Sequence, residues 1–274
     1  MGTKILIIII LCTGQSFGQK LSILSWNIKD FGQSRDDAEI ILIAQELRNA
    51  DIVAIQEVVA KHPGGVQAVA RLTDQLNRMG AIWDYAYTDP TGDLSSQKKE
   101  RYAFLWKSSK VKITNRVQLI SELDHAVCRE PAIAKFEVNG HNITILNYHA
   151  CTHTKAYPER KEIYSITQWL NKSNLENVIW CGDMNLEIDD KGFFSVFQAG
   201  LQSALHGEKT SLKKSCQDGI YKNRAEDNIL YKLNQLRLIS SKVLDFVNED
   251  NCKEVEWKWI SYSDHLPIQI TIKE

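Results

Sequence analysis

The stretch Ser263-Asp264-His265-Leu266 is the most informative part of the chain, because three polar clusters upstream complete it. Those clusters are Trp26-Asn27, Ile55-Gln56-Glu57 and Gly182-Asp183-Met184-Asn185. Each of them follows or ends a short apolar run that predicts a strand, and polar side chains at strand ends can converge at one rim of a sheet. Carboxylates and amides gathered there with a histidine predict an oxygen-rich site for Mg²⁺ or Mn²⁺. Such a site favours attack of water on a phosphate ester.

In sequence and in order these clusters resemble the endonuclease/exonuclease/phosphatase superfamily, which includes deoxyribonuclease I, exonuclease III, inositol polyphosphate 5-phosphatases and neutral sphingomyelinases. The resemblance runs from Leu21 to Ile272. It implies an α/β fold, a four-layer sandwich of two packed, mainly antiparallel β-sheets flanked by helices, with the site at the upper rim. No linker, repeat or low-complexity run divides the chain, so residues 20–274 are expected to form a single domain.

Apolar periodicity gives the expected elements of this fold. Helices are expected where apolar residues recur at three- and four-residue spacing, over Asp36–Asn49, Val66–Met79 and Glu159–Leu170. Strands are expected over the apolar and β-branched runs at 21–28, 51–56, 102–107, 111–120, 131–138, 142–148, 177–181, 227–232, 241–247 and 266–272.

Residues 1–19 read as a secretory signal peptide. Lys4 supplies the positive start, Ile5 to Cys12 is apolar but too short to span a bilayer, and the cut is expected after Gly18 or Gln19. The alternative is a buried first strand, which is disfavoured because a second apolar run begins at Leu21. We therefore expect a secreted or periplasmic protein without stable membrane insertion.

Five cysteines remain after that cleavage, and an oxidising compartment would allow disulfides between them. Asn139-Gly140 is a strong two-residue hairpin signal, in which Val138 faces His141. Continuing that pairing outward without a bulge places Cys128 opposite Cys151, within reach of a disulfide; two small core residues are the alternative. A looser expectation pairs Cys216 with Cys252 and leaves Cys181 as a buried thiol.

The resemblance also implies the metal ligands. Glu57 matches the metal-binding glutamate of the superfamily, and Asp264 is expected to be a second ligand. Asn27 would either touch the water shell of the metal or hold Glu57. The expected cofactor is Mg²⁺ or Mn²⁺, to which Ca²⁺ could be added.

Two histidines carry the expected proton chemistry. His265 is the expected general base, with Asp227 holding the imidazole in position. His149 is expected to bind or protonate a phosphoryl oxygen, with Glu100 of Lys99-Glu100-Arg101-Tyr102 as its orienting partner.

Two further segments resemble parts that handle the phosphate in the superfamily. Asp183 and Asn185 match the pair that positions water and the scissile phosphate. Arg129 of Arg129-Glu130-Pro131 is the candidate ligand of the substrate phosphate, because a guanidinium offers it two parallel donors. A surface ion pair is the alternative for this arginine.

The expected function is a secreted, monomeric, metal-dependent phosphodiesterase of deoxyribonuclease I type that acts on nucleic acid, with DNA preferred. A formal charge of -1 gives no basic field over the whole protein, so substrate phosphates must be met locally. Two minor-groove contacts of deoxyribonuclease I are missing, since Val58-Val59-Ala60 replaces an arginine and Lys98 a tyrosine. The alternatives are a sphingomyelinase or phospholipase C type enzyme, a sugar- or lipid-phosphate phosphatase, and an inactive binding protein on the same fold.

Overall fold

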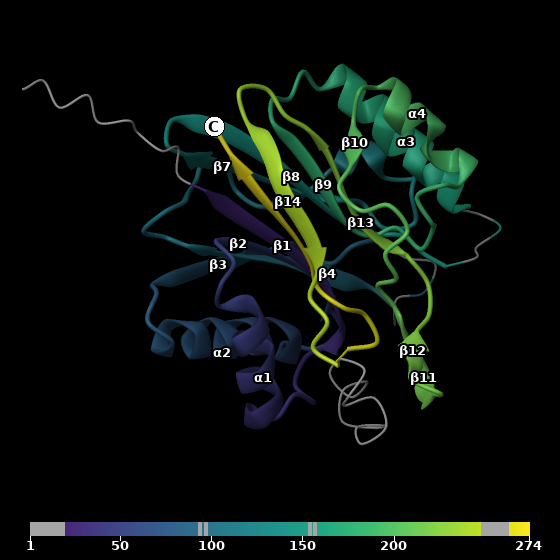
Figure 1. The fold of residues 1–274 in the computed structure, drawn as a ribbon. Helices are drawn as coiled ribbons and strands as arrows, with labels where there is room; N and C mark the ends of the chain where they lie inside the picture. Colours follow the sequence, from purple (N-terminus) through teal and green to yellow (C-terminus); the bar gives the residue numbers. More distant parts are fainter. Residues whose placement is uncertain (1–19, 93–94, 96–97, 153–154, 156–157, 248–262) are drawn as a thin grey trace, which may run out of the picture.

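Two β-sheets pack face to face, and helices cover the outer face of each sheet (Figure 1). The computed structural model describes residues 20–274 apart from 93–94, 96–97, 153–154, 156–157 and 248–262. This arrangement is the expected four-layer α/β sandwich. The predicted signal peptide, residues 1–19, lies outside the described residues.

The first sheet has six strands in the order β14-β15-β1-β2-β4-β3. Their bounds are β1 Leu21–Phe31, β2 Ile52–Val59, β3 Trp83–Tyr87, β4 Glu100–Lys107, β14 Arg237–Val243 and β15 Ile268–Lys273. Its outer face is covered by α1 Asp37–Leu47 and α2 Gly64–Arg78. A capping box between Asp36 and Glu39 begins α1 where the sequence predicts.

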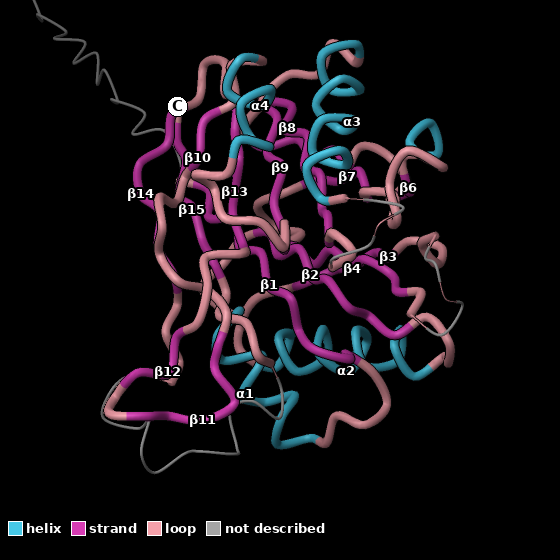
Figure 2. The backbone as a smooth tube through the Cα atoms, turned by 90° about the vertical axis from the view of Figure 1, so that its right-hand side faces the viewer, coloured by secondary structure: helices cyan, strands magenta, loops and turns pink. Residues whose placement is uncertain are grey.

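The second sheet has seven strands, in the order β10-β13-β9-β8-β7-β5 with β6 also on β7. Their bounds are β5 Lys112–Ile113, β6 Gln118–Leu119, β7 Ala132–Val138, β8 His141–His149, β9 Val178–Asp183, β10 Gln202–Ser203 and β13 Asp227–Lys232. The helical elements on its side are α3 Glu159–Lys172, α4 Phe194–Gln198 and two 3₁₀ turns, Ser121–Leu123 and Lys191–Phe193. A hairpin of β11 Leu212–Gln217 and β12 Ile220–Lys222 extends away from both sheets (Figures 1 and 2).

Each main sheet contains one pair of parallel strands, and a helix on the outer face connects the two strands of each pair. In the first sheet α1 joins β1 to β2, and in the second α3 joins β8 to β9. Parallel strands end at the same edge of their sheet, so the carboxyl ends of all four strands can supply side chains to one rim.

In the strands that reach the rim, side chains on one face form both the core between the sheets and, at the strand end, the polar rim. In β1, Leu21 and Ile23 face the second sheet, while Leu24 and Trp26 face the helices. The four strands β1, β8, β9 and β13 each carry inter-sheet apolar residues in line with a polar residue at the rim. Those rim residues are Asn27, His149, Asp183 and Asp227.

The hairpin and the first predicted disulfide are confirmed. Val138 pairs with His141, and the ladder runs without a bulge to Ala132 opposite Asn147. Beyond it Cys128 and Cys151 form a disulfide, with a Cα–Cα distance of 6.0 Å. Cys181 is a buried free thiol, as expected. The second expected pairing involves Cys252, which lies outside the described residues.

Two strand predictions are wrong in their bounds. The run 111–120 is not one strand, because residues 114–117 leave the ladder between β5 and β6. The strand predicted over 241–247 is Arg237–Val243, because Leu244 and Phe246 leave the sheet and pack against the core under α1 and α2. The half-exposed edge strand β3, the polar β11–β12 hairpin and the short β10 and α4 were not predicted. In the described ranges no helix has the length and apolar character needed to cross a bilayer.

Glu162 of α3 ties the helix to the sheet and to the disulfide loop. Its side chain is fully buried, and it accepts hydrogen bonds from the Tyr148 hydroxyl, at 2.6 Å, and from the backbone N–H of Cys128. Burial raises the pKa of Glu162 to about 7. A carboxyl whose pKa is raised in the folded state stabilises the fold below its unfolded pKa of 4.5. That contribution is lost as the pH rises through 7.

We predict that Glu162→Gln removes this pH dependence while keeping both hydrogen-bond positions filled. Relative to the wild type, the free energy of unfolding should be nearly unchanged at pH 4.5. At pH 7.5 the variant should be more stable, by at most roughly 3 kcal/mol. Urea unfolding across this pH range measures the difference. A difference that is constant with pH would contradict the prediction.

Candidate active site

Asp183 occupies the centre of the rim. It ends β9, is 1% exposed, and its Oδ2 accepts a hydrogen bond from Asn27 Nδ2 at 3.0 Å. The same oxygen lies 3.6 Å from Nε2 of both His149 and His265. Burial raises the pKa of Asp183, although the two imidazoles oppose the rise. One carboxylate therefore brings together side chains from both sheets and from the C-terminal segment.

His265 lies against a second carboxylate from β13. Its Nδ1 is 2.7 Å from Asp227 Oδ2, and the Thr210 hydroxyl donates to the same oxygen at 2.6 Å. Burial alone would lower the pKa of His265, but Asp227 and Asp183 outweigh it and hold that pKa well above its ordinary value. The ring is thus oriented through Nδ1, and Nε2 faces Asp183.

His149 is held in a similar way by Glu100 at the start of β4. Its Nδ1 lies 2.9 Å from Glu100 Oε2, and Arg129 Nε is 3.6 Å from that oxygen. Burial would lower the pKa of His149, but the Glu100 carboxylate outweighs it and the pKa is raised. For Glu100 the effects have the opposite sign: burial would raise its pKa, but His149 and Arg129 outweigh burial and the pKa is lowered. The expected pairing of Glu100 with His149 is therefore present in the structure.

Asn185 stands close behind Asp183 in the tight turn that ends β9. Its backbone N–H donates to Asp183 Oδ1 at 2.9 Å, and its amide donates to the Ala150 carbonyl at 2.8 Å. The residue has a left-handed φ of 48° and is 8% exposed. The turn therefore places the Asn185 side chain next to the strand end that carries His149.

Asn27 of β1 and Glu57 of β2 meet at the rim. Asn27 Nδ2 lies 3.2 Å from Glu57 Oε1, and Glu57 takes a left-handed φ of 61° at a register shift in β2. Asn27 Oδ1 is buried without a hydrogen-bond partner. Turning the amide over would aim this oxygen at the carboxylates of Glu57 and Asp183. The resulting set of oxygen donors fits a hard divalent cation.

The contacts of Asp264, the other predicted metal ligand, differ from those of Asn27 and Glu57. Its carboxylate is 3.6 Å from Lys29 Nζ, and its side chain is 39% exposed. Within the described part of the chain, one group of three acidic or histidine residues, Asp183, Asp227 and His265, has its ligand atoms all within 4.8 Å of one another. A candidate metal-binding cluster is thus present, and the assignment of Asp264 as a ligand stays a prediction.

Several supporting residues were not found from the sequence. Thr210 is buried and, through its hydroxyl, accepts the backbone N–H of Asp227 as well as donating to its carboxylate. Gln56 bridges the sheets by donating to Asn147 Oδ1 at 2.5 Å, and Asn147 donates to the Ile55 carbonyl at 3.0 Å. Thr210 belongs to no motif, and Gln56 belongs to the Ile55-Gln56-Glu57 cluster without a role predicted for it. Asn147 lies two residues before His149 in β8 and so shares a strand face with it.

A pocket of about 240 Å³ opens beside His149, and we call it the lysine pocket. It is lined by acidic and basic residues together with Val59 and His149; the basic ones are Lys61, Lys98, Lys99 and Arg129. Arg129 is 8% exposed, whereas the three lysines are exposed. The lysine pocket therefore places positive charge next to the candidate catalytic histidine.

Comparison with known proteins agrees with this geometry. A model of the Endonuclease/Exonuclease/phosphatase family matches residues 24–265, a span that contains every predicted site residue. The chain belongs to this family. As a member of the endonuclease/exonuclease/phosphatase family, it is an enzyme that hydrolyses phosphoester bonds.

The proteins that this chain resembles have names of different kinds. Deoxyribonuclease-1 of Bos taurus is 28% identical over 198 residues, covering 68% of this chain and 68% of the relative. TDP2 of D. rerio, complexed with a single strand DNA product, has a TM-score of 0.64 at 17% identity, covering 93% of this chain and 99% of that one. A mannosyl-6-phosphatase of Bacteroides thetaiotaomicron has a TM-score of 0.63 at 16% identity, covering 93% and 100%. These two structural likenesses show the fold.

We predict that Gly182→Ala damages both the fold and the site. Gly182 has a φ of +139°, and a Cβ there would lie 1.8 Å from the Tyr148 carbonyl oxygen. β9 would have to move away from β8 and carry Asp183 with it. The expected loss in free energy of unfolding is roughly 2–5 kcal/mol, with a large loss of phosphodiesterase activity.

Gly140→Ala is the matched control. It also has a positive φ, +81°, but nothing lies within 4 Å of the added Cβ. Urea unfolding should show a cost of roughly 1 kcal/mol and activity should be kept. Equal effects of the two substitutions would contradict the close approach of β9 to β8.

Proposed function

We propose that this chain is a secreted, monomeric endonuclease that depends on a divalent metal and hydrolyses DNA through residues 20–274 as one domain. The observation that carries the nuclease assignment is the lysine pocket beside His149 and Arg129. A substrate whose scissile phosphate lies between His149 and His265 would place its neighbouring groups in this pocket. Glu100 is paired with His149 and Arg129, and Glu57 is a proposed metal ligand. Lys61, Lys98 and Lys99 then outnumber the remaining acid of the lining, Asp30, and this excess of positive charge favours a substrate with a further phosphate.

The rival substrates fit the lysine pocket less well. Sphingomyelin has a zwitterionic headgroup, so its choline cation would meet the lysines unfavourably. A sugar phosphate with a single phosphate would bring no second phosphate to Lys61, Lys98 and Lys99. The similarity to a deoxyribonuclease of Bos taurus supports the same choice. An inactive binding protein would not need two carboxylate-held histidines at the rim.

In the proposed reaction His265 Nε2 takes a proton from the attacking water while Asp227 holds the ring through Nδ1. His149 acts as the charged partner, because Glu100 raises its pKa, and donates to a phosphoryl oxygen. The P–O bond to the leaving group breaks as the water oxygen bonds to phosphorus, and the leaving oxygen takes its proton from solvent. Arg129 neutralises the charge that develops on the phosphate, and Asn185 helps to position it. Each of these four residues is held in position by a contact with at least one neighbouring residue.

Asn27, Glu57 and Asp183 are the residues proposed to hold Mg²⁺ or Mn²⁺, with Asp264 and added Ca²⁺ as further parts of the prediction. The positive charge that the metal supplies when bound there would polarise the phosphate and oppose the proton on His265. The unpartnered Asn27 Oδ1 supports this placement.

The disulfide between Cys128 and Cys151 supports the proposed secretion. Such bonds persist in oxidising compartments and are rare in the cytosol. The proposed cut after Gly18 or Gln19 can be checked by N-terminal sequencing of the protein recovered from culture medium or periplasm.

The test of the proposed function is nicking of supercoiled plasmid DNA by the mature chain, with sphingomyelin and mannose 6-phosphate assayed in parallel. We predict nicking in Mg²⁺ that EDTA abolishes. Folded His265→Ala should lose roughly 10²–10⁴-fold in rate, the usual contribution of a general base. Rapid hydrolysis of either rival substrate without nicking would overturn the proposal. So would full activity after exhaustive chelation.

A second prediction isolates the lysine pocket. Lys98→Glu and Lys99→Glu together should lower kcat/KM on plasmid at least roughly tenfold and make its salt dependence shallower, because phosphate contacts are lost. Hydrolysis of bis(p-nitrophenyl) phosphate, which has a single phosphate, should be unchanged. Lys112→Glu, at the far end of the second sheet, is the matched control. Equal losses on both substrates would show that the pocket acts on the chemistry and not on the flanking phosphate.

A further inference from the structure

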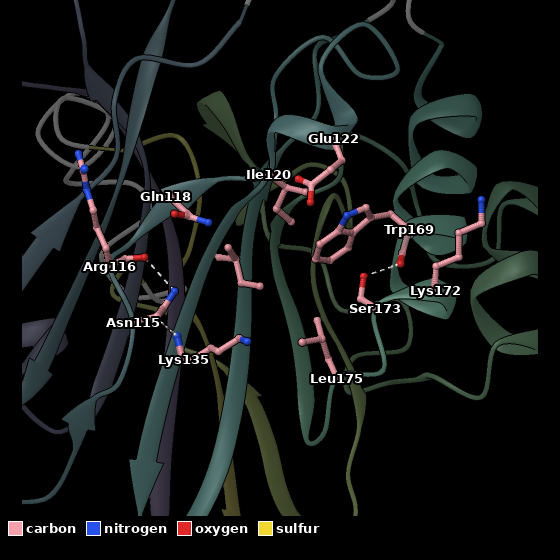
Figure 3. Close-up of a pocket in the computed structure, with 11 residues that line it drawn as sticks. Asn115, Arg116, Gln118, Ile120, Glu122, Lys135, Trp169, Lys172, Ser173 and Leu175 are labelled. Atoms are coloured by element: carbon pink, nitrogen blue, oxygen red, sulfur yellow. Dashed lines mark hydrogen bonds between the residues drawn. The ribbon is translucent and has the colours of Figure 1, made fainter.

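A groove of about 570 Å³ lies on the second sheet, beside the C-terminal half of α3. We call it the Trp169 groove and define it by the residues that the inference uses: Arg116, Ile133, Lys135, Trp169, Lys172 and Leu175. Figure 3 shows Trp169, Lys172 and Leu175 on one side and Arg116 and Lys135 on the other. None of these residues belongs to the active site.

The groove opens on the outer face of the sheet, opposite the inter-sheet core. Ile133 packs with the residues under α3, whereas its neighbours Ala132 and Ala134 face the inter-sheet core. His149 ends the inter-sheet row of β8. The Trp169 groove is therefore a separate site and not an extension of the lysine pocket.

Both walls of the groove are fixed by hydrogen bonds. Where residues 114–117 leave the sheet, Asn115 Oδ1 accepts the backbone N–H of Lys135 at 2.5 Å, and the Thr114 N–H donates to the Lys135 carbonyl at 2.8 Å. On the helix side the Ser173 hydroxyl donates to the Trp169 carbonyl at 2.6 Å. The break in the predicted strand thus builds one wall of a preformed groove.

The lining combines a flat aromatic ring with positive charge. Trp169, Ile133 and Leu175 supply apolar surface. The basic residues of the lining are Arg116, Lys135 and Lys172, and its one acidic residue is Glu122. Arg116 also reaches Asp89 at 3.8 Å, but these side chains are 84% and 82% exposed, so that pair holds the arginine weakly. A ligand that fits such a lining has a flat ring and a negative charge.

A nucleotide has both features, since its base can stack on an indole and its phosphate can meet lysine or arginine. We propose that the Trp169 groove binds one nucleotide unit of a single-stranded nucleic acid, with the base on Trp169 and the phosphate near Lys135, while Lys172 adds positive charge on the helix side. The site goes beyond the proposed function, because it binds a part of the strand that is not being cleaved. It would do so even if the active site acts on another ester.

The test measures binding without turnover, in EDTA and on a His265→Ala background. A fluorescein-labelled single-stranded DNA 12-mer is titrated by anisotropy, and unlabelled dAMP competes as the free nucleotide. Trp169→Ala should weaken 12-mer binding roughly five- to hundredfold, the usual effect of losing one stacked base. Lys135→Glu with Lys172→Glu should weaken it similarly and make the salt dependence shallower. If dAMP competes with the 12-mer and Trp169→Ala abolishes this competition, a free nucleotide is a second ligand of the groove. If the 12-mer binds but dAMP does not compete, the site is limited to strands.

Two controls separate binding from folding and from general charge. Trp169→Phe keeps a flat ring and should keep most of the affinity, and thermal unfolding shows whether Trp169→Ala is folded. Lys242→Glu changes an exposed lysine of β14, on the other sheet, and should have no effect. Unchanged affinity in both groove variants would overturn the proposal, even if the wild type nicks plasmid. Reduced affinity in both would support it even if the enzyme proves to cleave another substrate.

Discussion

The buried carboxylate of Asp183 is the constraint on which the site depends. A carboxylate at 1% exposure is costly unless cations or hydrogen-bond donors surround it. Here the compensating groups come from β1, from β8 and from the segment before β15, through Asn27, His149 and His265. Because no single element could supply them, both sheets and the C-terminal segment have to be in place for this charge to be tolerated. The site is therefore assembled from both sheets and from the C-terminal segment.

The two strand–helix–strand units explain why this convergence is possible. Each places two parallel strands side by side with their carboxyl ends at one edge, and the sheets face each other at that edge. Alternation then aligns each polar rim residue with apolar residues of the inter-sheet core. The cost of ordering the polar side chains is offset by the burial of that apolar core, as in other sandwiches. The same strands thus supply stability along their length and chemistry at their ends.

Local signals in the sequence predicted most of the framework. The Asn139-Gly140 turn fixes its hairpin register, and that register locates Cys128 opposite Cys151. Strands with one strongly apolar face were found to within a few residues. The prediction of the exposed edge strand β14 was shifted along the sequence because it included Phe246. In the structure Phe246 packs against Trp26 instead, with ring centroids 5.6 Å apart. The prediction of a single strand over 111–120 failed because the Asn115 side chain, and not the backbone, accepts the N–H of Lys135 in the middle of that run.

The site was predictable in its members but not in its contacts. Motif order identified His265, Asp227, His149 and Glu100, and the structure brings each pair together. The left-handed turn at Glu57 and the contact of Asp264 with Lys29 depend on tertiary placement that residue types do not reveal. Thr210 was missed for the same reason, since a single threonine in a loop gives no local signal of the aspartate it holds.

The burial of Cys181 has a consequence for the chemistry of the Cys128–Cys151 disulfide. Only a thiolate attacks a disulfide, and burial raises the pKa of the Cys181 thiol to about 12. The thiol is fully enclosed and donates to the Leu146 carbonyl at 3.4 Å. In the native state it therefore cannot exchange with the Cys128–Cys151 bond or form mixed disulfides with other chains. Exchange through Cys181 therefore requires that the two sheets come apart.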